Sequence, residues 1–286
     1  MQIFTTIHEL QTALNAKRQN GACIGLVPTM GNLHAGHLSL AHLAKQNSDV
    51  VVVSIFVNPT QFGVGEDFES YPRTLDADVA ALDGVADIVF APSVSEMYPK
   101  LPTSVQVLSG DIAKILCAKT RPTHFDGVGL VVSKLFNIVR PDVAVFGKKD
   151  YQQLAIIRRL NDELNFGIDI IGGEIVRADD GLALSSRNGY LSADERKIAP
   201  VLNRVLNALA KDVAAEFTGK ALSAERLAAL KQAAITQINE SGFQVDYLEI
   251  LNNNLENPAP EDKHLVILTA SFLGKARLLD NVEVFL

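Results

Sequence analysis

Short apolar runs of strand length alternate with helical segments through residues 1–175, and this alternation constrains the fold more than any other feature of the chain. The clearest run, 49–57, is apolar on both faces and ends at Asn58-Pro59. A strand buried on both faces is typical of a central position in a parallel sheet. The sequence therefore predicts an α/β fold, a Rossmann-like parallel sheet with helices on both faces.

The expected elements divide the chain into two domains, 1–175 and 176–286. For the first domain we expect strands at 22–27, 49–57, 86–90, 143–146 and 168–171, and helices at 38–46, 74–83, 127–139 and 151–165, with helical spacing also within residues 1–20. For the second we expect helices at 191–216 and 223–240 and strands at 245–250, 265–268, 276–279 and 282–286. Ser192 and Glu195 have the spacing of a capping box. The second domain is therefore predicted to be a smaller α+β lid.

Composition narrows the class of protein. The chain has 286 residues, of which 48% are hydrophobic, and a net charge of −7. An acidic surface argues against nucleic-acid binding, which needs a basic face. Cys23 and Cys117 lie far apart and indicate neither a disulfide framework nor a zinc site. With neither a signal peptide nor an apolar stretch long enough to span a bilayer, we expect a cytoplasmic protein without a membrane partner.

The segment 26–37 is the leading candidate for a ligand site. An apolar run stops at Pro28, a glycine turn follows, and His34-Ala-Gly-His37 begins a helical segment. Free backbone N–H groups at a helix N-terminus attract anions, and two imidazoles add further donors, so we expect a nucleotide triphosphate there. The alternative is a pair of structural histidines that cap the helix. Zinc is disfavoured because the pair lacks a third ligand nearby.

Four further polar clusters fall between the predicted elements. They are 147–150 (GKKD), 184–188 (LSSRN), 58–62 (NPTQF) and 121–127 (RPTHFDG). Lysine, arginine and hydroxyl groups neutralise phosphate, and amides suit a small hydroxylated or carboxylate ligand. Each cluster alone is also compatible with a solvated turn. No P-loop, G-x-G-x-x-G or G-x-S-x-G motif is present, so positioning and charge stabilisation would have to carry the chemistry.

Taken together, these segments resemble one family. The stretches 28–37 (PTMGNLHAGH), 56–62 (FVNPTQF), 121–125 (RPTHF), 132–137 (VSKLFN), 149–153 (KDYQQ) and 177–190 (RADDGLALSSRNGY) occur in the order found in the pantoate–β-alanine ligases, the pantothenate synthetases of the nucleotidylyltransferase superfamily. The resemblance implies a homodimeric ligase that uses ATP with Mg²⁺. Pantoate would attack the α-phosphorus of ATP, and β-alanine would attack the resulting pantoyl adenylate, giving pantothenate, AMP and pyrophosphate.

The resemblance also implies roles for particular residues. Catalytic roles fall to His37 as proton donor, His34 and Lys149. The implied ATP-binding residues are Met30, Gly31, Asn32, Leu33, His34, Ala35, Gly36, His37, Gly147, Lys148, Lys149, Asp150, Val176, Leu184, Ser185, Ser186 and Arg187. Those implied for pantoate and β-alanine are Gln61, Gln153, Asn58 and His124. Asp150 is the candidate carboxylate for Mg²⁺.

Two positions depart from the family pattern, and three other functions stay open. Lys148 stands where the family usually has Glu, and would strengthen nucleotide binding if it faced the phosphates. Thr123 stands where Gly is commoner, which bears on the geometry of the His124 loop. The alternatives are a nucleotidylyltransferase with a phosphorylated acceptor, a nucleotide-binding regulator without turnover, and a class I aminoacyl-tRNA synthetase, for which the chain is short and acidic.

Overall fold

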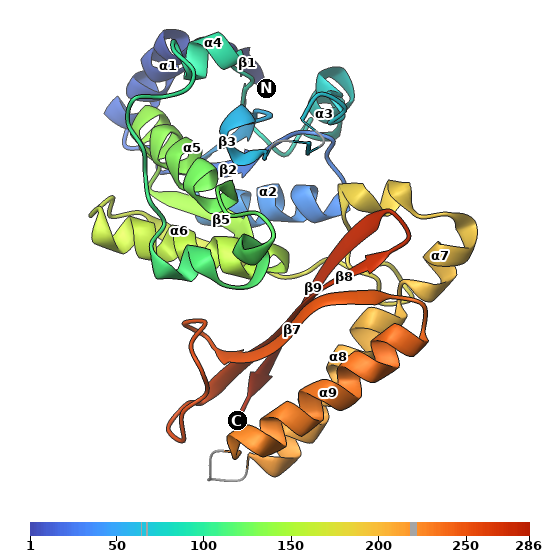
Figure 1. The fold of residues 1–286 in the computed structure, drawn as a ribbon. Coiled ribbons are helices and arrows are strands. Elements are labelled where there is room, and N and C mark those ends of the chain that lie inside the picture. The colour runs from blue at the N-terminus through green and yellow to red at the C-terminus, as the bar shows by residue number, and fades with distance from the viewer. Residues whose placement is uncertain (64, 67, 218–221) are drawn as a thin grey trace. The chain divides into compact units, whose positions relative to one another are not determined.

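The computed structural model describes residues 1–63, 65–66, 68–217 and 222–286 (Figure 1). The chain divides into two compact units, one of residues 1–148 and 152–174, the other of residues 149–151 and 175–286. The elements in chain order are β1 (Gln2–Phe4), α1 (Ile7–Gln19), β2 (Ile24–Thr29), α2 (Ala35–Asn47), β3 (Val50–Ile55), η1 (Pro59–Gln61), α3 (Leu75–Ala81), β4 (Ile88–Phe90), α4 (Val94–Met97), η2 (Asp111–Lys114), η3 (Leu116–Lys119), α5 (His124–Val139), β5 (Val143–Gly147), η4 (Lys148–Asp150), α6 (Tyr151–Glu163), β6 (Asp169–Gly173), η5 (Ser186–Tyr190), α7 (Ala193–Ile198), α8 (Val201–Glu216), α9 (Ala224–Glu240), β7 (Gln244–Asn252), β8 (His264–Leu273) and β9 (Ala276–Phe285).

The first unit is built on a six-stranded sheet with the order β1-β4-β3-β2-β5-β6, and every neighbouring pair is parallel. The strands β4-β3-β2-β5-β6, in their order across the sheet, follow the doubly wound arrangement. The chain moves from β2 to β4 in one direction across the sheet and from β2 to β6 in the other. Such sheets bind ligands beyond the carboxyl ends of their strands at the point of reversal. The carboxyl ends of β2 and β5, which are adjacent, are therefore where a ligand is expected.

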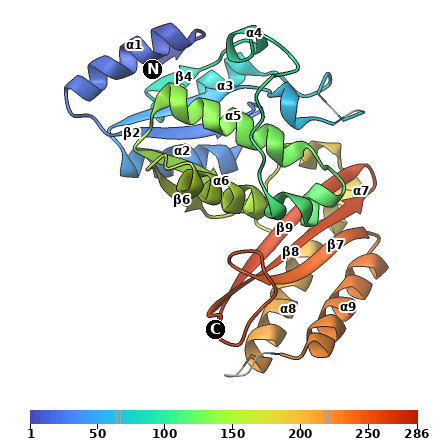
Figure 2. The ribbon, with the colours of Figure 1, turned by 60° about the vertical axis from the view of Figure 1, so that its left-hand side comes forward.

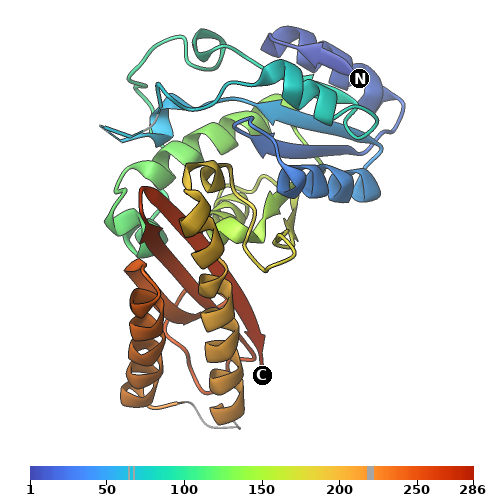
Figure 3. The same cartoon turned by 90° about the vertical axis from the view of Figure 1, so that its right-hand side faces the viewer.

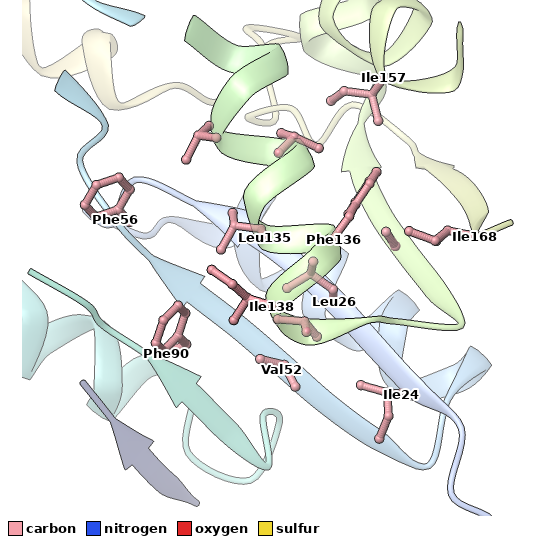
Figure 4. Packing of buried hydrophobic residues seen from close by; sticks show 14 of the residues in the cluster. Ile24, Leu26, Val52, Phe56, Phe90, Leu135, Phe136, Ile138, Ile157 and Ile168 are labelled. Carbon is pink, nitrogen blue, oxygen red and sulfur yellow. The ribbon is translucent and has the colours of Figure 1, made fainter. Parts of the chain in front are cut away.

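Helices cover both faces of this sheet (Figure 2). Helices α1, α5 and α6 pack on one face, where Leu135 and Phe136 lie over Leu26 and Val52 (Figure 4). Helix α2 and the segment around α3 cover the other face, against side chains such as Val53. Neighbouring side chains of a strand point to opposite faces, so strands buried on both sides are apolar throughout. This is the fold class that the sequence predicts, and it is confirmed.

The second unit contains a three-stranded antiparallel sheet in the order β7-β8-β9. Helices α8 and α9 pack against it (Figure 3). Their apolar stripes form a core of their own with the sheet, in which Leu206 and Ile267 are fully buried. Ser192 and Glu195 form the predicted capping box at the start of α7. The expectation of a smaller α+β unit is confirmed.

One strand was not predicted, and two expectations about elements are wrong. The edge strand β1 has only three residues, too few to show a pattern. The single helix expected at 191–216 is two helices, α7 and α8, because Pro200 supplies no backbone N–H for a continuous helical ladder. The two strands expected at 276–279 and 282–286 are one strand, β9. Asp280 and Asn281 interrupt its apolar pattern without ending it, because both are buried and hydrogen-bonded.

No helix in the described ranges is long and apolar enough to cross a membrane.

Candidate active site

The loop from Met30 to His34 leaves the carboxyl end of β2 through a tight left-handed turn. Gly31 and Asn32 have φ values of +80° and +52°. Only glycine adopts such values without cost, and asparagine tolerates them better than most residues. The turn delivers His34 as the N-cap of α2, which begins at Ala35. The helix therefore starts three residues before the predicted 38–46 and contains both Gly36 and His37.

The two histidines cap the helix reciprocally. The Gly36 N–H donates to His34 Nδ1 (3.1 Å), and the His34 N–H donates to His37 Nδ1 (3.3 Å). The ring centroids are 4.2 Å apart, and both side chains are half-buried. A ring nitrogen that accepts a hydrogen bond carries no proton, so each neutral ring holds its proton on Nε2. The helix-capping role considered as an alternative is thus present, and it leaves each ring with Nε2–H as its donor.

Most backbone N–H groups of the loop are not free, although the sequence predicts free N–H groups for an anion there. Besides the two amides used by the histidine caps, the Gly31 N–H donates to Thr29 Oγ1 (3.2 Å). The amides of Asn32 and Leu33 donate to the carboxylate of Asp78 (3.0 and 2.7 Å). A left-handed turn aims consecutive N–H groups into one concavity, and here a protein carboxylate already occupies it. The backbone amides of Gly31, Asn32, Leu33, His34 and Gly36 are therefore all engaged within the protein.

The segment that follows β3 brings Gln61 to the same loop. Gln61 is buried, and its Nε2 lies 3.0 Å from the Sδ of Met30. Asn58 anchors this segment: its Nδ2 donates to Gln61 Oε1 (3.0 Å) and to the Gly127 carbonyl (3.1 Å). Its Oδ1 accepts from Tyr98 and from Thr60. Asn58 is 1% exposed, so its side chain positions Gln61 rather than facing a ligand. Burial raises the pKa of the Tyr98 phenol, which therefore remains the donor to Asn58.

The loop before α5 also contacts Gln61. His124 Nδ1 donates to the Gln61 carbonyl (2.9 Å). Arg121 forms a bidentate ion pair with Glu66, with distances of 2.7 and 2.5 Å, and the Arg121 guanidinium lowers the pKa of Glu66. Thr123 has φ −103°, which any residue adopts, so a threonine in place of the commoner glycine does not strain this loop. His124 therefore orders the backbone of Gln61.

The two lysines that follow β5 have different partners. Lys148, in the first unit, pairs with Glu174 at the end of β6. Lys149 belongs with the second unit, where its carbonyl accepts from Asn281 Nδ2 (3.0 Å) and its Nζ lies 3.7 Å from Asp150 Oδ2. Lys148 stands where the family usually has glutamate. Its positive charge is therefore matched by a carboxylate of the protein itself.

The adjacent glutamines Gln152 and Gln153 differ in burial and in hydrogen bonding. Gln152 is buried: its Nε2 donates to the carbonyls of Ile112 and Ile115, and its Oε1 accepts from the Cys117 N–H. It ties η2 and η3 to the start of α6. Gln153 is half-buried, and its side chain forms no hydrogen bond with the residues that the structure describes. Gln153 is therefore the one of the two that is suited to bind a ligand.

In the second unit, residues 176–188 form a tight loop that ends at η5. Arg177 and Ala183 form an antiparallel bridge, and the Leu184 N–H donates to the Val176 carbonyl (2.9 Å). Ser185 caps η5 by accepting from the Arg187 N–H (3.3 Å). The structure thus brings Val176 next to Leu184 and presents Ser185, Ser186 and Arg187 on one turn, all partly exposed.

A bidentate ion pair fastens this loop to β9. Arg177 donates to both carboxylate oxygens of Asp280 at 2.8 Å. Asp280 is 4% exposed, so the pair is largely removed from water. The geometry of the loop therefore depends on the edge of the antiparallel sheet.

Sequence reasoning missed several residues that order these segments. They are Asp78, Tyr98, Gln152, Arg177, Asp280 and Asn281. For Asp78 a signal existed, since it lies four residues before Leu82 on the apolar side of α3, where a carboxylate is out of place. For the others, only the tertiary contact shows the role.

The fold defines a class, the α/β proteins with a doubly wound sheet, which bind ligands beyond the carboxyl ends of the strands. The family model described as Pantoate-beta-alanine ligase matches residues 2–283. The chain belongs to this family.

Relatives with the corresponding names are similar to the chain over nearly its whole length. Pantothenate synthetase from Psychrobacter sp. (strain PRwf-1) is 58% identical over 284 residues, 98% of each chain. Pantothenate synthetase from Acinetobacter baylyi is 52% identical over 285 residues, 99% of each chain. The crystal structure of pantothenate synthetase from Thermus thermophilus superposes with a TM-score of 0.89 at 40% identity, covering 100% of both chains. Pantoate-beta-alanine ligase from Francisella tularensis, complexed with beta-gamma ATP and beta-alanine, gives 0.80 at 35% identity, covering 99% of this chain and 97% of that one.

Proposed function

We propose that this chain is an ATP-dependent ligase that joins pantoate to β-alanine. In the first half-reaction a pantoate carboxylate oxygen attacks the α-phosphorus of ATP, and pyrophosphate leaves. In the second, the β-alanine amine attacks the acyl carbon of pantoyl adenylate, AMP leaves, and the amine loses a proton. The observation that carries the proposal is the meeting of two motifs about 30 residues apart, the Met30 loop and Gln61, beyond adjacent strands β2 and β3.

The proposal assigns the nucleotide to the histidine loop. His34 and His37 donate from Nε2 to the triphosphate as neutral rings, because protonating either Nδ1 would set two donors against each other and break a helix cap. This favours hydrogen bonding over proton transfer by His37. Lys149, Ser185, Ser186 and Arg187 contribute cationic and hydroxyl donors to phosphate, and Val176 and Leu184 contribute backbone contacts.

Pantoate is assigned to Gln61 and Gln153, whose amides bind its hydroxyls and carboxylate, while Asn58 and His124 hold Gln61 in place. Binding through neutral amides suits an acceptor without a phosphate group. This favours the ligase over a nucleotidylyltransferase that acts on a phosphorylated acceptor.

Mg²⁺ is assigned to the triphosphate, with Asp150 as the protein carboxylate. Magnesium is usually held by phosphates and one or two carboxylates rather than by a protein cage. Within the described ranges no group of three or more His, Cys, Asp or Glu side chains could hold a metal, and the half-exposed Asp150 beside Lys149 fits a shared site. Bound Mg²⁺ would neutralise charge on the phosphates.

We also propose that the chain acts in the cytoplasm, where ATP is available, and as a homodimer. Sedimentation equilibrium tests the assembly: the expected mass is twice that of the 30.9 kDa chain, and a monomer at micromolar concentration would contradict it.

The activity is tested by incubating the purified protein with ATP, pantoate and β-alanine. AMP and pyrophosphate should form in equal amounts, and AMP release should require all three substrates. ADP as product would overturn the ligase reaction, and a stable nucleotide-linked product would indicate a nucleotidylyltransferase. ATP binding without turnover would indicate a regulator.

A further inference from the structure

Asp78 is a buried carboxylate to which the proposed reaction assigns no role. It lies on α3 and is 2% exposed. Its Oδ1 accepts from the Leu33 N–H (2.7 Å), and its Oδ2 accepts from the Asn32 N–H (3.0 Å) and the Thr74 hydroxyl (3.1 Å). Two of its three partners are therefore backbone amides of the loop that precedes His34.

Burying this charge is costly, because a carboxylate removed from water needs strong compensation. In the part of the chain that the structure describes, Asp78 forms no ion pair with a lysine, arginine or histidine. Its compensation comes from the three hydrogen bonds alone. A hydrogen bond from an N–H group to an ionised acceptor is stronger than one to a neutral acceptor. The charge of Asp78 therefore strengthens its two hydrogen bonds to the loop.

The two contacts hold the left-handed turn at Gly31 and Asn32. A non-glycine residue in this conformation is less favourable than glycine, and the bond from Asn32 to Asp78 helps to hold it there. Asp78 also packs closely against Gly31, since a Cβ at Gly31 would lie 3.0 Å from Asp78 Oδ2. Asp78 thereby fixes the direction in which the chain enters α2.

The direction of entry determines where the imidazoles lie. His34 follows Leu33 directly and is the N-cap, and the His34 N–H orients the His37 ring. Rotation of the Asn32 or Leu33 peptide would therefore displace both rings.

We propose that Asp78 is a positioning residue for His34 and His37, and that it supports the nucleotide half of the reaction selectively. This rests on the proposed function, in which the two rings contact the triphosphate. Since β-alanine attacks an acyl carbon after pyrophosphate has left, the second half-reaction depends less on the rings.

The test measures the two half-reactions separately in the full-length wild-type protein and in Asp78→Asn. The first is pyrophosphate release from ATP and pantoate. The second is pantothenate formation from prepared pantoyl adenylate and β-alanine. An asparagine keeps the shape but turns one acceptor oxygen into a donor facing a backbone N–H. We expect the first half-reaction to slow by about 10- to 100-fold, as small misplacements of reacting groups do, and the second to change less than about twofold.

Asp142→Asn is the matched control, because Asp142 also accepts from a backbone N–H of β2, at Ile24, but at the opposite end of the strand. It should leave both half-reactions unchanged. Should Asp78→Asn fail to fold, Thr74→Val removes one bond to the same carboxylate and should show a smaller selective loss.

A second measurement reports on the rings themselves. Ring ¹⁵N shifts should show His34 and His37 with the proton on Nε2 in the wild-type protein, and mixed tautomers in Asp78→Asn. Equal slowing of both half-reactions, or no slowing with unchanged tautomers, would overturn the positioning role. A wild-type protein inactive in both assays would instead refute the proposed ligase function.

Discussion

Lys148 and Lys149 are neighbours in sequence, but their ammonium groups have different partners. Lys148 pairs with Glu174, whereas Lys149 lies near Asp150. We expect Lys149→Ala to lower kcat by about 10²–10³, the usual loss for one preorganised charge that stabilises a transition state. Lys148→Ala is the control and should change kcat by less than about threefold, because its charge is already matched. Steady-state kinetics check both, and a wild-type kcat in Lys149→Ala would remove Lys149 from the mechanism.

The ion pair between Glu66 and Arg121 predicts a pH dependence of stability. Arg121 lowers the pKa of Glu66 below its ordinary 4.5, so the pair stabilises the folded state above pH 4.5. The contribution is lost as the pH falls through the folded-state pKa. We expect Glu66→Gln to be less stable than wild type by about 1–2 kcal/mol at pH 7, and the difference to shrink in acid.

Urea unfolding over a series of pH values measures this difference. Glu69→Gln, an exposed neighbour, should match wild type throughout. A difference for Glu66→Gln that stays constant down to pH 3 would show that the ion pair is not its source.

Among the elements, the contact between α5 and η1 depends on Gly127. A Cβ at this position would lie 2.2 Å from the Thr60 carbonyl oxygen and 2.7 Å from the Gln61 Cα. Gly127→Ala must therefore push η1 away from α5, and overpacking of this kind costs about 1–3 kcal/mol. Because Gln61 moves with η1, we expect the KM for pantoate to rise by about tenfold or more.

Substrate kinetics and thermal unfolding test both effects. Gly63→Ala is the control, since its Cβ would make only an ordinary contact, 3.6 Å from Glu66. An unchanged KM in Gly127→Ala would mean that Gln61 does not bind pantoate or that η1 tolerates the shift.

At the scale of the whole molecule, the two units have separate hydrophobic cores. Leu135 lies in the core under α5, and Leu206 lies in the core between α8 and the antiparallel sheet. We expect Leu206→Ala to destabilise by about 2–5 kcal/mol and to speed native-state hydrogen exchange in α8, α9 and β7–β9. Exchange in β2 and β3 should not change. Leu135→Ala should give the reciprocal pattern, and equal acceleration everywhere would show a single cooperative unit.

Much of this organisation could be predicted from the sequence because it depends on local pattern. Runs of strand length that are apolar on both faces, such as 49–57, are typical of strands in a sheet covered on both sides. The parallel sheet, its helices and the polar loops at strand ends follow from that constraint. Pro200 also carried a local signal, but the apolar spacing continued past it and hid the break between α7 and α8.

The segment 26–37 shows which features the sequence determines and which depend on the tertiary structure. By itself the sequence determined a strand, a glycine turn and a helix close behind two histidines, because each depends on neighbours within a few residues. Only the tertiary structure decided which groups remain for a ligand. Asp78, 45 residues from Leu33, takes the backbone amides, and the histidines take the helix cap. A hydrogen bond between distant segments leaves no local pattern, so only the fold shows that these two amides already donate to a carboxylate of the protein.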